Sequence, residues 1–538
     1  MKSSSLLLLV LIQIFYDSSI SIAQEIHPNW ARHDTTDVDG LYGAPFVHTD
    51  TDGNIVVCSN DFNPGPLLSM LTTKYTADGQ VLWQQKFDLE GQDDPRTSLC
   101  DQQNAVYVAG NTGQNSIMGA VPGMVLLKYA ANGNLEWSYR YEGPAIGQNY
   151  VTRILFDADQ NVVVFGNYSN IALVKTGLFA VKLSPDGQVL WSASHVDTEF
   201  GFVGVGARWM NDRWVFWGRN SGATDTRYLA WQLTDEGQTI TAAQTGLNPA
   251  HSPEAVQIGN DGSLYVSTWI KYQVLKFGLD GQKLWEYDKP NNQPLPQGVK
   301  ARVNVIGTDS VGNVFVYGFF RQIEGAQLLS TKINPQGSLE WEHTTMLNGN
   351  RVLPSNLTWL NDSTMLVAST VSTVADSNFY EFAFLLYNQN GFLGAGYSDL
   401  QGRRNAPKNM AIANESLYVA GIADKSTFTD PRRQILCKYD LNDLYGLVST
   451  SEKTTLPLIY WPNPASDWVK LYLPQGVNMS TSCLLELRDA TGRLVYVQKT
   501  AGGDTEIEFP LENLPTGFYL LTLTTGDGGV YVGKVIKH

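Results

Sequence analysis

Cysteine, charge and long apolar segments are all scarce in this chain. Four cysteines in 538 residues are too few for a disulfide framework, so we expect thiols buried among apolar side chains. Charged residues make up only 17% of the chain, the net charge is -15, and no basic run occurs. Because binding to nucleic acid depends on lysine and arginine contacts with phosphates, we expect no nucleic-acid partner.

The one extended apolar run lies at the amino terminus. An early lysine is followed by the apolar stretch Leu6 to Tyr16 and by small residues up to Ala23. A charged start, an apolar middle and a small-residue exit are typical of a secretory signal peptide, which we predict over residues 1–23. The run is too short to cross a bilayer, and no transmembrane segment is expected elsewhere.

One phrase recurs through most of the chain: a strand, a turn built on Asp-Gly or Asn-Gly, and a strand that carries tryptophan. KYTADGQVLW (residues 74–83) and KLSPDGQVLW (residues 182–191) are two copies. A period of about 50 residues indicates one supersecondary unit that is repeated many times. The glycines of these turns are Gly79, Gly133, Gly187, Gly237, Gly281, Gly337 and Gly391.

Each unit also has an Asp/Asn-rich turn that leads into a strand of β-branched and aromatic residues. We count eight copies, from Asp50–Ser59 to Asn414–Gly421. This alternation indicates strands, and no stretch shows a helical period. Four strands in about 50 residues describe a β-propeller blade. The prediction is an all-β chain with an eight-bladed propeller, or a seven-bladed one if a degenerate copy is not a blade.

The two ends of the repeat region complement each other. The last unit has no tryptophan hairpin arm after Asn442, whereas His27–Arg32 precedes the first unit and contains Trp30. We predict that this amino-terminal strand lies beside Gln434–Asp440 and closes the ring, which would remove two bare sheet edges. The recurring tryptophans are expected to pack between neighbouring blades.

The composition changes after the propeller, which we predict at residues 24–446. The polar stretch 447–455 indicates a linker. Residues 456–538 contain short alternating strands, a pattern typical of a small antiparallel β-sandwich.

Four segments of this last module carry a family resemblance: YWPNPASDWVKLYL (460–473), LRDATGRLVYV (487–497), LENLPTGFYLLTL (511–523) and GKVIKH (533–538). The module resembles the C-terminal sorting domain of proteins exported by the type IX secretion system of Bacteroidetes. The resemblance implies an address read by the outer-membrane translocon, with the passenger released or attached to the cell surface. It assigns the sorting signal to Pro462, Asn463, Pro464, Pro515, Gly517, Tyr519, Lys534 and Lys537.

The Gly-x-x-x-Trp hairpins resemble those of a broad group of secreted propellers that includes the pyrroloquinoline quinone enzymes. Those enzymes generally have two adjacent cysteines in the active site. No two cysteines are neighbours in this chain, so we expect no quinone and no other cofactor. The seven histidines show no ligand spacing. Asp50–Gly53 begins like a calcium loop, but no acidic closing residue follows, and we favour Asx turns over calcium.

Function in such a ring is expected on the long loops. Trp217 and Trp269 lie at or near strand ends where long loops begin. Their rings are suited to stack on sugars, but packing into space left by the missing hairpin tryptophan at Thr241 explains them as well, and we favour packing. No recognisable catalytic constellation occurs. We therefore expect an exported protein that binds a glycan or a protein; the alternative is an extracellular polysaccharide hydrolase or lyase that uses loop carboxylates.

Overall fold

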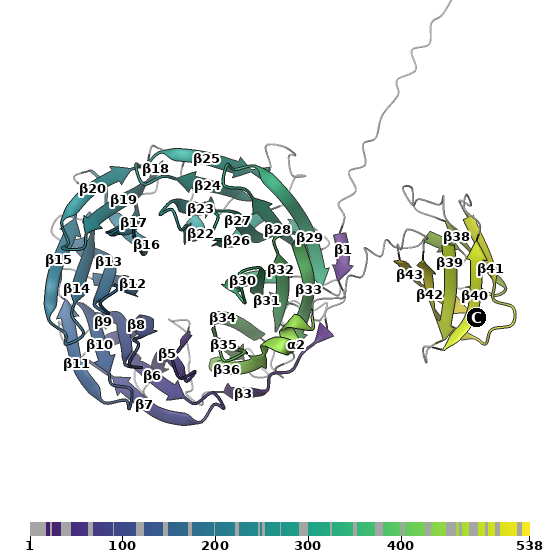
Figure 1. Cartoon of the computed structure of the whole chain (residues 1–538), viewed down its shortest axis with the longest axis horizontal. Coiled ribbons are helices and arrows are strands. Elements are labelled where there is room, and N and C mark those ends of the chain that lie inside the picture. The colour runs from purple at the N-terminus through teal and green to yellow at the C-terminus, as the bar shows by residue number, and fades with distance from the viewer. Residues whose placement is uncertain are drawn as a thin grey trace, which may run out of the picture. The chain divides into compact units, whose positions relative to one another are not determined.

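Figure 1 shows the computed structural model of the chain. The chain forms two compact units, Met1–Val448 and Ser449–His538. The residues whose structure is described are 18–21, 24–33, 45–62, 68–89, 91–114, 123–141, 143, 149–170, 175–197, 199–220, 225–245, 248–249, 253–268, 271–289, 300–322, 325–347, 352–371, 380–398, 400, 404–424, 432–447, 459–461, 465–472, 483–489, 493–500, 506–524 and 530–537.

Eight antiparallel sheets build the first unit, and the four repeat strands of each are called A to D from the inner to the outer edge. Sheet 1 has β4 (Phe46–Thr49), β5 (Ile55–Phe62), β6 (Leu68–Tyr75) and β7 (Val81–Phe87). Sheet 2 has β8 (Gln92–Cys100), β9 (Val106–Gln114), β10 (Gly123–Tyr129) and β11 (Leu135–Tyr141). Sheet 3 has β12 (Asn149–Phe156), β13 (Val162–Asn170), β14 (Lys175–Leu183) and β15 (Val189–His195). Sheet 4 has β16 (Phe202–Met210), β17 (Arg213–Asn220), β19 (Tyr228–Thr234) and β20 (Thr239–Gln244).

The other four sheets follow the same plan. Sheet 5 has β22 (Pro253–Ile258), β23 (Leu264–Thr268), β24 (Gln273–Phe277) and β25 (Lys283–Asp288). Sheet 6 has β26 (Lys300–Thr308), β27 (Val314–Gln322), β28 (Gly325–Ile333) and β29 (Leu339–Leu347). Sheet 7 has β30 (Val352–Trp359), β31 (Thr364–Val371), β32 (Glu381–Asn388) and β33 (Gly391–Ser398). Sheet 8 has β34 (Arg404–Ala413), β35 (Ser416–Asp424), β36 (Arg432–Asp440) and, as its D strand, the amino-terminal β3 (Trp30–His33).

The burial of a strand follows its place in the sheet. The C strand β6 is buried at every position, whereas the D strand β7 alternates between exposed and more buried residues. Continuous apolar burial is what a strand needs when neighbouring sheets cover both of its faces, and alternation is what an outer strand needs when one face meets water. Apolar clusters accordingly bridge neighbouring sheets, as Leu126 of sheet 2 and Val164 of sheet 3 do.

The A strands form the inside of a ring. Each A strand contacts the A strands of the sheets before and after it, and β34 of sheet 8 contacts β4 of sheet 1. In Figure 1 the sheets lie around a common centre with the A strands innermost. The first unit thus has a β-propeller-like, all-β fold.

The amino-terminal strand pairs as the sequence predicts. β3 is antiparallel to β36, with Trp30 opposite Lys438. Just before it, Ile26 is buried in the apolar cluster of sheets 7 and 8, and β2 (Gln24–Glu25) runs parallel to β33. Sheet 8 therefore combines strands from both ends of the unit.

The remaining elements are small. β1 (Ser18–Ser21), which lies inside the predicted signal peptide, runs parallel to β29; the rest of residues 1–23 lies outside the described residues. β18 (Asp225–Thr226) pairs with β21 (Asn248–Pro249), and the helix α2 (Leu441–Tyr445) follows sheet 8. No helix among the described residues has the length and apolar character to cross a bilayer.

Two antiparallel sheets make the second unit. One has β37 (Ile459–Trp461), β38 (Trp468–Tyr472) and β41 (Glu506–Pro510); the other has β40 (Leu494–Thr500), β39 (Cys483–Asp489), β42 (Gly517–Thr524) and β43 (Val530–Lys537). Residues from both sheets, such as Val469 and Leu521, form one buried apolar cluster. This is the arrangement of a small β-sandwich.

Candidate functional site

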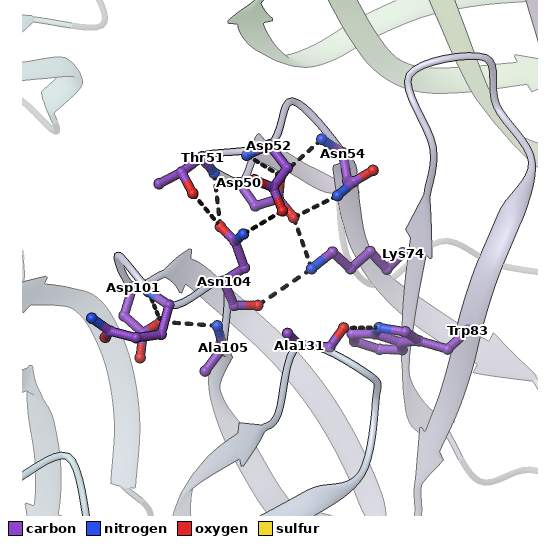
Figure 2. Close-up of polar contacts among 11 residues, drawn as sticks. Asp50, Thr51, Asp52, Asn54, Lys74, Trp83, Asp101, Asn104, Ala105 and Ala131 are labelled. Atoms are coloured by element: carbon purple, nitrogen blue, oxygen red, sulfur yellow. Dashed lines mark hydrogen bonds and ion pairs between the residues drawn. The ribbon is translucent and has the colours of Figure 1, made fainter.

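The recurring tryptophans reach from one sheet to the next. In Figure 2 the indole N–H of Trp83 in sheet 1 donates to the carbonyl of Ala131 in the C–D turn of sheet 2, at 2.9 Å. Five other tryptophans make the equivalent hydrogen bond over 2.7 to 3.3 Å, so the repeated ring both fills the junction and binds a turn carbonyl. The pairs are Trp30 with Ala77, Trp137 with Pro185, Trp191 with Asp235, Trp285 with Pro335 and Trp341 with Gln389.

Five of the seven turn glycines lie under the tryptophan ring of the preceding sheet, whereas Gly281 faces the backbone of Gln244 and Gly391 faces His343. Gly133 has a φ of 91°, and a Cβ atom there would lie 2.6 Å from the ring of Trp83. Glycine adopts a positive φ without the Cβ penalty, and its lack of a side chain leaves room for the indole. The Gly-x-x-x-Trp phrase therefore encodes a contact between consecutive units rather than within one.

Buried lysines add a second link between sheets. In Figure 2 the ammonium of Lys74 lies 2.8 Å from the carboxylate of Asp50 in its own A–B turn and donates to the carbonyl of Asn104 in the A–B turn of sheet 2. The Asp50 carboxylate also accepts hydrogen bonds from the amides of Asp52 and Asn54. Burial alone would raise the pKa of Asp50, but these partners outweigh it and the pKa is lowered.

This arrangement bears on the calcium alternative. Lys74 neutralises the Asp50 carboxylate, and its oxygens already accept backbone and side-chain hydrogen bonds. Calcium needs several oxygen ligands that carry unneutralised charge. Asp50–Gly53 is accordingly an Asx turn, and Asp157 makes the same turn and pairs with Lys182 in sheet 3.

The junction between sheets 4 and 5 differs from the six tryptophan junctions, because Thr241 stands in place of the tryptophan. There the side-chain amide of Gln232 donates to the carbonyl of Leu279 at 3.2 Å. A Cβ atom on Gly281 would lie 2.3 Å from the backbone carbonyl oxygen of Gln244. Backbone thus occupies the place that an indole ring takes elsewhere, and an amide replaces the indole as donor.

Trp217 is fully buried at this same junction. Its indole N–H donates to the carbonyl of Gly262 in sheet 5 at 3.0 Å, and its ring packs with residues such as Val266 and Phe277. The side chain is enclosed between two sheets and is not available for a ligand to stack on. Trp269, the other aromatic residue proposed to face a ligand, lies outside the described residues.

The acidic residues at the start of sheet 2 hold the backbone in place. Asp93 is fully buried and accepts hydrogen bonds from the amides of Leu89 and Gly113 and from the hydroxyl of Thr112. Asp94 pairs with Arg96 at 3.0 Å. Burial raises the pKa of both carboxyl groups.

His48 has a Ser98 hydroxyl as a neighbour, with Nδ1 and Oγ 3.0 Å apart. Burial lowers the pKa of His48 to about 4, so the ring is neutral near pH 7. Nε2 is buried as well, so the pair lacks the access to substrate that a nucleophile and its base require. No group of three His, Cys, Asp or Glu side chains that could hold a metal occurs among the described residues.

Residues that sequence reasoning overlooked lie on the inner A strands, where Arg96, Arg153 and Lys408 are exposed. The available signal was their basic character in a chain with net charge -15. Recognising it requires knowing which strand of each unit is innermost.

In the second unit, Tyr519 is buried and its hydroxyl donates to the Pro515 carbonyl at 2.5 Å, which fixes the turn before β42. Gly517 begins β42 and an added Cβ would meet nothing within 4 Å. Lys537 donates to the carbonyl of Ser466, and Lys534 is opposite Leu520 in the β42–β43 register. Pro462, Asn463 and Pro464 lie outside the described residues.

Residues 459–538 match the family model of the secretion system C-terminal sorting domain. The chain is cargo of the type IX secretion system. The sorting domain directs export across the outer membrane, either to the cell surface or into the surroundings. A search of curated proteins returned no match.

Several solved structures are distantly similar to this type IX cargo. A protein of unknown function from Bacteroides caccae is 12% identical, with 53% of this chain and 90% of that chain covered and a TM-score of 0.30. YCF48 bound to D1 peptide is 7% identical, with 78% and 98% covered and a TM-score of 0.41. The polysaccharide lyase Uly1 is 10% identical, with 77% and 100% covered and a TM-score of 0.39.

Proposed function

We propose that this cargo is an eight-bladed β-propeller, closed by its amino-terminal strand, which binds an extracellular glycan or protein without catalysing a reaction. In this proposal residues 1–23 are a signal peptide, 24–446 the propeller, 447–455 a linker and 456–538 the sorting domain. The observation that carries the proposal is the series of junctions between sheets, at seven of which an indole or amide donor binds a turn carbonyl of the next sheet.

The closing junction supports eight blades. Trp30 of sheet 8 donates to the carbonyl of Ala77 in sheet 1, and its ring lies against Gly79, as the ring of Trp83 lies against Gly133. The closing junction thus has the same indole donor as five junctions between sheets that are consecutive in the chain. In a ring closed by β3, the edge of β36 is paired, so another chain cannot add a strand there.

The absence of catalysis is supported by the roles of three acids, Asp93, Asp94 and Asp197. Asp93 and Asp94 are satisfied by the backbone and by Arg96, and Asp197 accepts from the amides of Glu199 and Phe200. A glycosidase needs two carboxyl groups that face the substrate at a set separation. Carboxylates that hold turns in shape are instead features of a rigid scaffold.

A glycan array and a reducing-sugar assay on the same polysaccharides, with the full exported chain, test this function. We expect binding to at least one polysaccharide or surface protein without release of reducing ends. Turnover that a single carboxylate change such as Asp94→Asn abolishes would replace the proposal with the hydrolase or lyase alternative.

The sorting residues are tested separately by secretion. We propose that Pro462, Asn463, Pro464, Pro515, Gly517, Tyr519, Lys534 and Lys537 form the signal read by the translocon. Without residues 456–538, the propeller should remain in the periplasm and should not cross the outer membrane. Appearance of the truncated propeller in the medium at the level of the full chain would contradict this assignment.

A further inference from the structure

A β-bulge interrupts the A strand in every sheet from 2 to 8. The extra residue is Arg96 in β8, Thr152 in β12 and Lys408 in β34. The same shift of register occurs in β16, β22, β26 and β30. Bulges re-aim side chains and are over-represented next to functional sites. The inner surface of the ring therefore has one level at which side chains are redirected.

The charge of these strands is opposite to that of the chain. The eight A strands contain seven basic and three acidic residues, so their net charge is 7 − 3 = +4, whereas the whole chain has -15. The basic residues are Arg96, Arg153, Arg208, Lys300, Arg302, Arg404 and Lys408, and the acidic ones are Asp93, Asp94 and Glu254.

The three acids on these strands are already engaged. Asp94 pairs with Arg96, Glu254 pairs with Arg302, and Asp93 accepts backbone amides. Arg96 nevertheless keeps 41% of its side chain exposed. Arg153 is exposed, and no acid among the described residues pairs with it. Arg96, Arg153 and Lys408 are therefore exposed cations on the A strands.

Three of these cations lie on one arc of the ring. β34, β4, β8 and β12 contact one another in that order. Lys408, Arg96 and Arg153 occupy three of these four strands, at or directly after the bulge. We call this set the basic arc. A ligand that meets all three cations must present several negative charges along an extended length.

We propose that the basic arc binds an acidic polysaccharide, with carboxylate groups on successive sugars paired to Lys408, Arg96 and Arg153. This inference rests on the binding function proposed above and names the class of ligand. Planar guanidinium groups match carboxylates in a bidentate geometry, and a uronate chain supplies one carboxylate at every sugar. A small monovalent anion reaches only one of the three cations.

Calorimetric titration of the full chain with polygalacturonate tests the inference, with neutral dextran as the comparison ligand. The variant R153Q/K408Q removes two cations of the basic arc. We expect it to bind polygalacturonate about tenfold more weakly, since each lost carboxylate pair weakens binding by a few-fold. R140Q removes one cation from the outer strand β11 and should change affinity less than about twofold. Circular dichroism melting verifies that each variant folds.

The outcomes separate this inference from the proposed function. Polygalacturonate binding that weakens between about 50 mM and about 500 mM salt, and that is about tenfold weaker in R153Q/K408Q, supports the basic arc. Binding of dextran alone, or equal affinity in R153Q/K408Q and the parent, overturns the acidic-ligand inference and leaves the binding function standing. Failure of every array glycan and surface protein to bind overturns both.

Discussion

The junction between sheets 4 and 5 and the six tryptophan junctions solve one problem with different groups. Each supplies a donor to a turn carbonyl, and at five of the six tryptophan junctions the ring also fills the space above the turn glycine. Trp83 does both with one side chain, whereas Gln232 supplies the donor and the backbone of Gln244 fills the space. The repeat therefore keeps a contact between neighbouring sheets, and tryptophan is one of the side chains that can make this contact.

The largest effect is expected from Trp83→Ala. The ring is 9% exposed and packs on Gly133, so its removal leaves a cavity and an unpaired Ala131 carbonyl. We expect a loss of about 3–5 kcal/mol in the free energy of unfolding, measured by urea denaturation. Trp468→Ala, at a residue 38% exposed in the other unit, should leave the propeller transition unchanged. Equal losses for the two variants would refute the packing role.

Alanine at two turn glycines compares the junctions directly. Gly133→Ala forces a positive φ on alanine and costs about 1–2 kcal/mol, since the facing Trp83 ring can shift. Gly281→Ala has the same φ cost but meets the backbone of Gln244, which cannot move aside. We expect the larger loss for Gly281→Ala in thermal unfolding. The reverse order would show that the sheet 4–5 junction is the looser one.

Removing the amide donor at the unusual junction has a smaller effect. Gln232→Leu leaves the Leu279 carbonyl without this partner and should cost about 1 kcal/mol in urea denaturation. Gln84→Leu is the control, because the hydrogen bond of Gln84 among the described residues is to Thr73 within sheet 1 and does not cross a junction. A Gln232→Leu variant as stable as its control would mean that the amide does not replace the indole.

The smallest expected effect concerns the dependence of stability on pH. Burial alone would raise the pKa of Asp261, but hydrogen bonds from Lys276 and Ser263 outweigh it and the pKa is lowered below 3.8. A carboxyl group with a lowered pKa stabilises the fold at pH values above its unfolded-state pKa. This stabilisation is lost as the pH falls through the folded-state pKa. Because Asp261 is 52% exposed, Asp261→Asn should cost only about 0.2–1 kcal/mol at pH 7.

The same variant should be less sensitive to acid than the parent below about pH 4, since it has no carboxylate to protonate at this position. Chemical denaturation at several pH values measures this difference. Parallel pH profiles for the two chains would exclude the Asp261–Lys276 pair as a source of acid sensitivity.

Much of the first unit follows from the sequence because its signals are local. The alternation around Gly133 and Trp137 predicts a hairpin, and the segment around Trp30 is predicted as the missing partner of Gln434–Asp440, which is the pairing of β3 with β36. The direction of each tryptophan contact does not follow, because a repeat has the same letters whether a ring packs on its own turn or the next.

Other features depend on tertiary context. Trp217 stands at a strand end that leads to a long loop, yet the neighbouring sheet covers it completely. The exposure of Arg153 depends on the bulge at Thr152, and one extra residue in a strand leaves no clear mark in the alternation of a single sequence. The burial or exposure of such residues can be identified only from the arrangement of neighbouring sheets in the folded protein.

The pairing of β3 with β36 places the first and last parts of the ring in one sheet. Trp30–His33 must therefore wait unpaired while about 400 residues fold between them, and the search for that distant neighbour is expected to be the slow step in forming the ring. A cut that removes only these four residues would bare the side of β36 and withdraw the Trp30 donor from Ala77, so a short trim at one end would loosen two sheets at once.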